Sequence, residues 1–219
     1  MRKIIVGAFV SLDGIMQAPG GPHEDPVGGF KYGGWAFPYF DEAMGQAVDE
    51  MFAKPFDLLL GRKTYDIFAA HWPYAGADDP IGSLFDRITK YVATRNPDLK
   101  LDWQNSQTLG SDVLGTLRRL KSEEGPDLLT QGSTEFLQTL FHNDLVDEMY
   151  ISYFPVVLGK GKKLFGEGAT PMALKLVSSR VSGTGVTVNK YVRGGPVVTG
   201  SFEFEQPSEA ELERRRKLT

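Results

Sequence analysis

The chain has 219 residues, a formal net charge of −4 and a pI of about 5.5, which excludes the basic surface expected of a nucleic-acid-binding protein. It contains no cysteine, so disulfides and thiolate sites are excluded. No apolar run approaches the roughly 20 residues that cross a bilayer. We therefore expect one cytoplasmic domain over residues 1–206, with a charged tail at 207–219 and no nucleic-acid or membrane partner.

The first two thirds of the chain alternate apolar strands with amphipathic helices. Residues 3–10 form a nearly continuous apolar run, which is typical of a strand buried on both faces. Further strands are predicted at 56–60, 91–94, 127–131 and 148–154. Helices are predicted at 41–53, 64–70, 112–123 and directly after Ser133. Alternation of this kind predicts a parallel sheet with helices on its faces.

The pattern changes near the C-terminus, where strand follows strand. Segments 172–181, 186–192 and 201–205 have the alternating apolar residues of antiparallel strands. Ser208 then begins a capping box and a charged helix, which we interpret as solvated. The predicted fold class is therefore α/β, with a mixed, mostly parallel sheet and antiparallel strands at its C-terminal end.

Three predicted strand ends carry groups suited to phosphate. Gly61, Arg62, Lys63 and Thr64 follow one strand, and two cations at a helix N-terminus are disfavoured unless an anion is present. Thr94 and Arg95 end the next strand, and Gln131, Gly132, Ser133 and Thr134 end another. The alternative interpretation is solvated side chains and an ordinary helix cap.

The segment 92–96 bears on the choice of cofactor. Arg95 offers a planar fork of donors that suits a phosphate. No acidic residue, the usual partner of an unmodified ribose, lies in this segment. The pattern favours NADP over NAD. His23, His71 and His142 have no paired spacing, so we predict no metal site.

The long glycine-rich loop at 13–38 carries aromatic side chains that include Trp35 and Phe37. They could stack on a planar substrate, or they could pack the loop down or form a contact between two copies in a homodimer. Asp41 and Glu42 follow the loop as candidate proton donors. Both are equally explained as acids at a helix N-terminus.

Six short motifs in one order resemble the dihydrofolate reductase superfamily, closest to the reductase domain of bifunctional riboflavin-biosynthesis deaminase-reductases and its stand-alone relatives. They are SLDG at 11–14, LGRKTY at 60–65, TR at 94–95, QGS at 131–133, VDEMYIS at 146–152 and PVVLG at 155–159. The resemblance covers residues 3 to about 205. It implies a dihydrofolate reductase-like fold and NADPH held by the three strand-end segments.

The resemblance also implies that Ala8 and the loop at Asp13 and Gly14 lie near the nicotinamide, which makes Asp13 a third candidate acid. The activity it implies is NADPH-dependent reduction of a small planar heterocycle, with 5-amino-6-(5-phosphoribosylamino)uracil as the substrate that the likeness favours. Two alternatives stay open. One is a reductase of dihydrofolate or of another carbonyl or imine, and the other is a module that binds NADPH without turnover.

Overall fold

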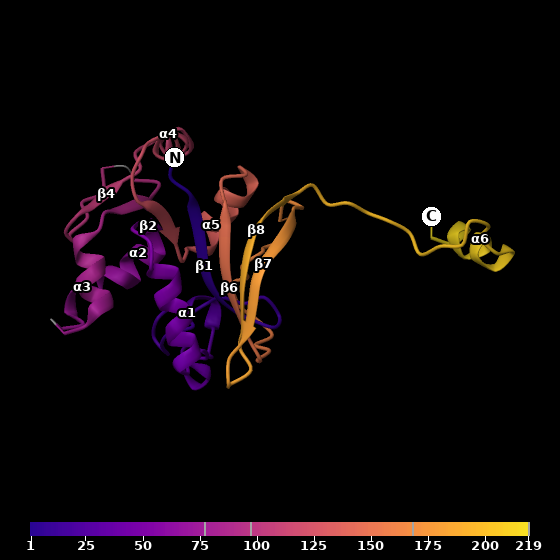
Figure 1. Ribbon diagram of the computed structural model, residues 1–219, viewed down its shortest axis with the longest axis horizontal. Helices are drawn as coiled ribbons and strands as arrows, with labels where there is room; N and C mark the ends of the chain where they lie inside the picture. Colours follow the sequence, from indigo (N-terminus) through magenta and orange to yellow (C-terminus); the bar gives the residue numbers. More distant parts are fainter. Residues whose placement is uncertain (77, 97, 168, 219) are drawn as a thin grey trace.

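An eight-stranded mixed sheet forms the centre of the protein, as a computed structural model covering residues 1–76, 78–96, 98–167 and 169–218 describes it (Figure 1). The strand order is β4-β3-β2-β5-β1-β6-β8-β7. The strands are β1 (Ile4–Ser11), β2 (Phe56–Gly61), β3 (Lys90–Ala93), β4 (Ser106–Thr108), β5 (Asp127–Thr130), β6 (Glu148–Phe154), β7 (Ala173–Val181) and β8 (Thr187–Gly195).

All pairings from β4 to β6 are parallel, whereas β8 is antiparallel to both β6 and β7. This arrangement confirms the predicted fold class. The strand β5 enters between β2 and β1, so the chain moves to one side of the sheet after β1 and to the other side after β5. In open α/β sheets a ligand binds at the carboxyl ends of the strands beside such a switch.

Helices cover both faces of the parallel part. They are α1 (Glu42–Phe52), α2 (Arg62–Ala69), α3 (Pro80–Arg87), α4 (Val113–Ser122) and α5 (Thr134–His142), with α6 (Glu209–Arg216) further on. Short 3-10 turns lie at Val27–Gly29, Phe37–Tyr39 and Trp72–Tyr74. No helix among the described residues is long and apolar enough to span a bilayer.

Alternation along β1 explains the two-sided core. Ile4 and Val6 point to the face covered by α4 and α5, while Ile5 points to the face covered by α1, α2 and α3. In β5, Leu128 and Leu129 divide between the faces in the same way. Because both faces are buried, consecutive residues in the middle of these strands are apolar, with no alternation between apolar and polar side chains.

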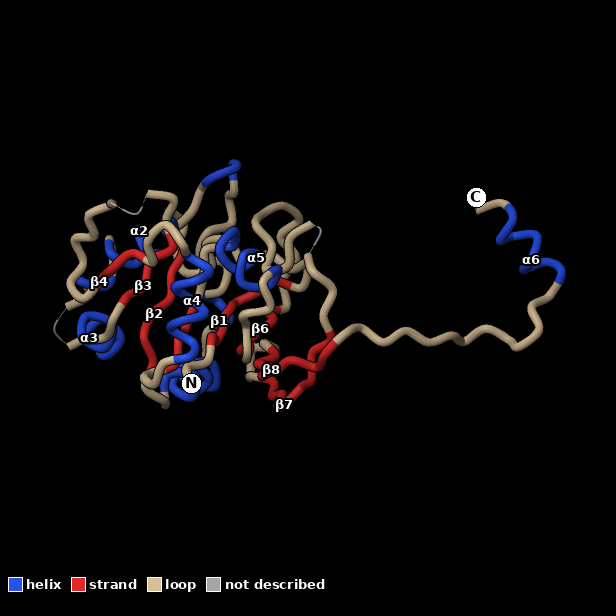
Figure 2. Tube along the Cα trace, turned by 90° about the horizontal axis from the view of Figure 1, so that it is seen from above, coloured by secondary structure: helices blue, strands red, loops and turns tan. Residues whose placement is uncertain are grey.

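One α-helix and one strand were not predicted from the sequence, and one predicted strand is wrong. The helix α3 begins at Pro80 behind the cap Asp79, and β4 is a three-residue polar strand at the sheet edge. The predicted strand at 201–205 has no strand conformation in the structure. Both of its phenylalanines, Phe202 and Phe204, are exposed, because the chain leaves the sheet after Gly195 (Figure 2).

Candidate functional site

The ends of β2 and β5 meet where two helices begin. The N–H of Gly61 donates to the carbonyl of Gly132 over 2.9 Å. A Cβ on Gly61 would lie 2.7 Å from the backbone nitrogen of Ser133, and one on Gly132 would lie 2.6 Å from Oγ1 of Thr64. Such close approach requires glycine at both positions. We name this meeting point, residues 61–64 with 131–134, the glycine junction.

The glycine junction presents two helix N-termini side by side. The N-cap of α2 is Gly61 and that of α5 is Ser133, and neither helix has a side-chain capping hydrogen bond. The first-turn N–H groups of a helix have no intrahelical partner and attract anions. The buried Thr130 hydroxyl donates to the Gly132 carbonyl and fixes the loop behind them, where the peptide between Gly132 and Ser133 is cis.

Cationic side chains surround the junction. Arg62 pairs with Asp66 over 2.7 Å, and Lys63 reaches across to Glu135 of α5 over 3.7 Å. All four groups are exposed to solvent, so these pairs contribute little to stability and can exchange for an anion. Ala93 is paired with Gly61 in the sheet, which brings the exposed Arg95 to the same edge.

The first loop after β1 is held by Asp13. Its carboxylate accepts hydrogen bonds from the Ser11 hydroxyl and from the N–H groups of Leu158 and Gly159. Desolvation raises the pKa of Asp13, but these hydrogen bonds outweigh it and hold the pKa below its ordinary value. The carboxylate is therefore ionised at neutral pH and ties the loop after β1 to the loop after β6.

The acids at the start of α1 differ in their surroundings. Asp41 caps the helix by accepting from the N–H of Met44, and its second oxygen accepts from the N–H of Thr184 in the β7–β8 turn. The bond from Met44 is the main reason that the pKa of Asp41 is lowered. Glu42 is exposed and accepts from Gln46. Both acids occupy a helix N-terminus, as the alternative interpretation expected.

Aromatic side chains gather around Phe154, the last residue of β6. Trp35 is 7% exposed, meets Phe154 edge-on at 5.2 Å and donates its indole N–H to the Gln17 carbonyl. Phe37, at 80% exposed, lies away from this cluster. Two of the rings near the loop that solvent reaches are the half-buried Phe9 of β1 and Phe40, which is 46% exposed; their centres lie 6.1 Å apart.

Phe9 is not among the site residues predicted from the sequence. It lies inside an apolar strand, where the sequence pattern predicts a core residue. Only its contact with Phe40 in the structure distinguishes it from the other apolar residues of β1. Ala8 is buried in β1 and faces the opposite side, toward α5. Gly14 has a φ of +86°, and its carbonyl accepts from the N–H of Leu164.

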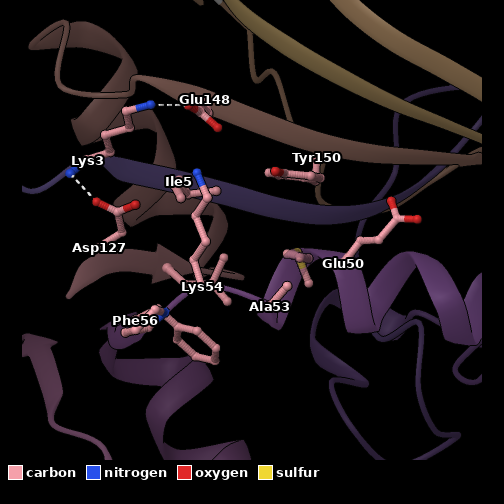
Figure 3. A pocket seen from close by; sticks show the side chains of 12 residues that line it. Lys3, Ile5, Glu50, Ala53, Lys54, Phe56, Asp127, Glu148 and Tyr150 are labelled. Atoms are coloured by element: carbon pink, nitrogen blue, oxygen red, sulfur yellow. Dashed lines mark hydrogen bonds and ion pairs between the residues drawn. The ribbon is translucent and has the colours of Figure 1, made fainter.

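The cavity shown in Figure 3 lies at the other end of the sheet. It has a volume of about 90 Å³ and is lined by the amino ends of β1, β2, β5 and β6 together with the end of α1. Lys3, Asp127 and Glu148 line it, and none of the predicted site residues does. Sites for small ligands usually measure 300–1,000 Å³. We therefore centre the candidate site on the glycine junction.

Comparison with known proteins agrees with the fold. The family described as RibD C-terminal domain matches residues 2–188. YyaP of Bacillus subtilis (strain 168), an uncharacterized protein, is 28% identical over 188 residues, which cover 84% of this chain and 92% of YyaP.

Two solved structures have the same fold. The dihydrofolate reductase of Enterococcus faecalis, complexed with NADP(H), matches with a TM-score of 0.55 and 14% identity over 88% of this chain and 96% of its own. A diaminohydroxyphosphoribosylaminopyrimidine deaminase/5-amino-6-(5-phosphoribosylamino)uracil reductase of Thermotoga maritima matches with a TM-score of 0.57 and 15% identity over 88% of this chain and 56% of its own.

Proposed function

This chain belongs to the RibD C-terminal domain family, and on that premise we propose that it is an NADPH-dependent reductase of a small planar heterocycle. The observation that carries the proposal is the glycine junction, where two uncapped helix N-termini lie side by side at the carboxyl ends of β2 and β5. A dinucleotide brings a pyrophosphate, and paired helix N-termini suit that group.

The residues of the junction fit such a cofactor. A Cβ on Gly61 or Gly132 would fill the space between the two loops, so the close backbone approach depends on both glycines. Arg62, Lys63 and Arg95 lie around the same edge and would hold the phosphates. When bound, reduced nicotinamide supplies a hydride; the chain's own residues bind, orient and shield the reactants.

The preference for a phosphorylated cofactor rests on charge. Arg95 follows the strand next to β2, and residues 92–96 contain no acid that could accept from an unmodified ribose. A guanidinium matches the oxygens of a 2′-phosphate. The E. faecalis reductase of the same fold is complexed with NADP(H).

For the substrate we propose a planar ring placed against Phe9 and Phe40. Phe9 lies in β1 and meets Phe40 edge-on, and Phe9 and the buried Trp35 both pack edge-on against Phe154. Stacked and edge-on aromatic contacts suit a flat heterocycle. The proposed substrate is 5-amino-6-(5-phosphoribosylamino)uracil, which the T. maritima protein is named for reducing.

Reduction of a C=O or C=N bond also consumes a proton. Asp13 and Asp41 both have lowered pKa values, so at neutral pH each is an acceptor that positions a loop. Glu42 is exposed at the helix N-terminus. A part for these three acids in proton transfer stays a prediction, and variants of Asp41 and Glu42 test it for two of them.

The experiment is a substrate panel followed by loss of NADPH absorbance. The panel contains the phosphoribosylaminouracil, dihydrofolate and simple carbonyl and imine compounds, each with NADPH and with NADH. Turnover of the uracil with NADPH supports the proposal in full. Turnover of dihydrofolate or of a simple carbonyl instead of the uracil would keep the reductase activity but change the proposed substrate. NADPH binding without any turnover favours a binding module.

A further inference from the structure

The chain beyond Gly195 projects from the domain as an arm, residues 196–218 (Figures 1 and 2). The arm lies outside the family match at residues 2–188. It carries apolar side chains that touch little: Val198 is 88% exposed, Phe204 is 87% exposed and Phe202 is fully exposed. Apolar side chains gathered in this way on an extended segment indicate an interaction surface.

The arm contains a strand pattern that has no sheet. Residues 202–205 read Phe-Glu-Phe-Glu, so in extended conformation both phenylalanines lie on one face and both glutamates on the other. This alternation predicts a strand, yet the segment pairs with no strand among the described residues. A strand needs a partner for its backbone N–H and C=O groups.

The strand β7 forms one edge of the sheet, opposite the edge formed by β4, and it is paired with β8 on one side only. Its pairing register places Leu174, Leu176 and Val181 on the face shared with Tyr191 of β8. Leu176 and Val181 are 50% and 68% exposed. Edge strands with exposed apolar residues readily add another strand.

The opposite face of β7 is basic. Lys175 and Arg180 lie there, and Arg180 pairs with Glu50 of α1 in a contact that solvent reaches. A strand that places Phe202 and Phe204 on the apolar face of β7 necessarily places its two glutamates beside these cations. Both faces of the arm segment therefore match both faces of β7, since opposite charges and apolar pairs across neighbouring strands are favourable.

We propose that residues 201–205 of one copy add as a ninth strand to β7 of a second copy. In the isolated chain the arm runs away from its own β7 in both views, with α6 far from the domain (Figures 1 and 2). The segment from Pro196 to Pro207 reaches about 40 Å when extended. Each copy has one arm and one β7 edge, so a reciprocal exchange closes into a two-fold dimer.

The helix α6 is a solvated end of the arm. Its arginines pair within the helix, as Arg214 does with Glu211. Arg215 also pairs with Glu203, with both groups substantially exposed. Exposed pairs of this kind exchange at little cost, so Glu203 is able to turn toward the cations of β7.

The first test is sedimentation of the full chain and of three variants from low to high micromolar concentration. We expect a dimer for the unchanged chain, and monomers for Phe202→Ser/Phe204→Ser and for Leu176→Lys/Val181→Lys. Leu218→Ser, which changes another exposed apolar residue of the arm, is the matched control and stays dimeric. Circular dichroism and melting temperature report that each variant is folded.

The second test identifies which copy the arm meets. Because the chain has no cysteine, Ser178→Cys and Glu203→Cys can be introduced into separate chains and mixed under oxidising conditions. Disulfide-linked dimers of one chain of each kind support the proposal.

Several results overturn it. These are an unchanged chain that stays monomeric at every concentration, or a dimer that survives loss of both phenylalanines. The proposal is also overturned if a disulfide forms only when both cysteines lie in one chain, because the arm would then pair with the sheet of its own copy.

Discussion

The N–H of Gly61 donates to the carbonyl of Gly132 over 2.9 Å, and this bond joins the starts of α2 and α5. The two residues are 71 positions apart in the sequence. They meet because β5 enters the sheet directly beside β2, in register from Phe56 to Leu58. The parallel pairing therefore builds the candidate anion site from two separate helix starts.

Gly61→Ala tests the junction. The new Cβ would lie 2.7 Å from the Ser133 nitrogen, which is backbone and cannot turn aside. We expect a loss of about 1–3 kcal/mol in the free energy of unfolding, and NADPH binding weakened by tenfold or more. Denaturant unfolding and a fluorescence titration measure the two effects.

Gly45→Ala is the matched control. It lies within α1, and a Cβ there would meet nothing within 4 Å. Alanine in a helix interior is favoured over glycine by about 1 kcal/mol. The control should therefore be as stable as the original chain or more so, with unchanged NADPH affinity. Equal NADPH affinity of Gly61→Ala and Gly45→Ala would show that the glycine junction is not part of the cofactor site.

Asp41→Asn and Glu42→Gln separate two roles at the start of α1. Asp41 links the helix to the β7–β8 turn through Thr184. Since its pKa is lowered in the folded chain, its contribution to stability is present above its ordinary pKa and fades as the pH falls through the folded pKa.

We therefore expect Asp41→Asn to lower the melting temperature at neutral pH and to flatten its dependence on pH in the acid range. We expect turnover to fall more than NADPH affinity, because Asp41 directly follows Phe40, one of the two rings proposed to hold the substrate. Glu42→Gln should change both little. Full turnover by both variants would leave no catalytic part for either acid.

Lys90 predicts a pH dependence at the alkaline end. Its side chain is fully buried, donates to the Phe85 carbonyl over 2.6 Å and lies 4.4 Å from the Trp103 ring centre. Desolvation lowers its pKa from 10.5 to about 8, although Asp86 and Asp57 oppose the shift. Between these pH values the unfolded chain binds the proton and the folded chain does not.

The free energy of unfolding should therefore rise with pH across this window, by roughly 1–3 kcal/mol from this group. Lys90→Met keeps the apolar stem and removes the titration. Urea unfolding of both proteins at pH 7, 9 and 10 compares their free energies of unfolding. Tyr153 and the other tyrosines are present in both proteins, so their contribution to the pH dependence cancels in the difference. Parallel pH profiles for the two proteins would show that Lys90 keeps its charge in the folded chain.

Local patterns were enough to predict most of the sheet. The strand at 148–154 and the inward face of α5 agree with the structure. The helix α3 and the strand β4 escaped prediction, because one is two turns long and the other consists of three polar residues.

The site was less predictable, because side-chain direction depends on distant residues. The sequence places Trp35 in an aromatic loop, but Phe154, 119 positions later, holds it inside the core. The alternation at 201–205 indicates a strand, but among the described residues this segment pairs with no strand of the sheet. Pairing between distant segments decides both outcomes.

The most direct test of the central claim is a pair of titrations, NADPH and NADH, on the unchanged chain and on Arg95→Ala. Arg119→Ala is the control, because that arginine lies on α4 and pairs with Glu123. The account predicts tighter binding of NADPH than of NADH. It also predicts that Arg95→Ala narrows the difference by roughly 1.5–3 kcal/mol, while Arg119→Ala leaves it unchanged. Equal affinity for the two cofactors in the unchanged chain, or no binding of either, would contradict it.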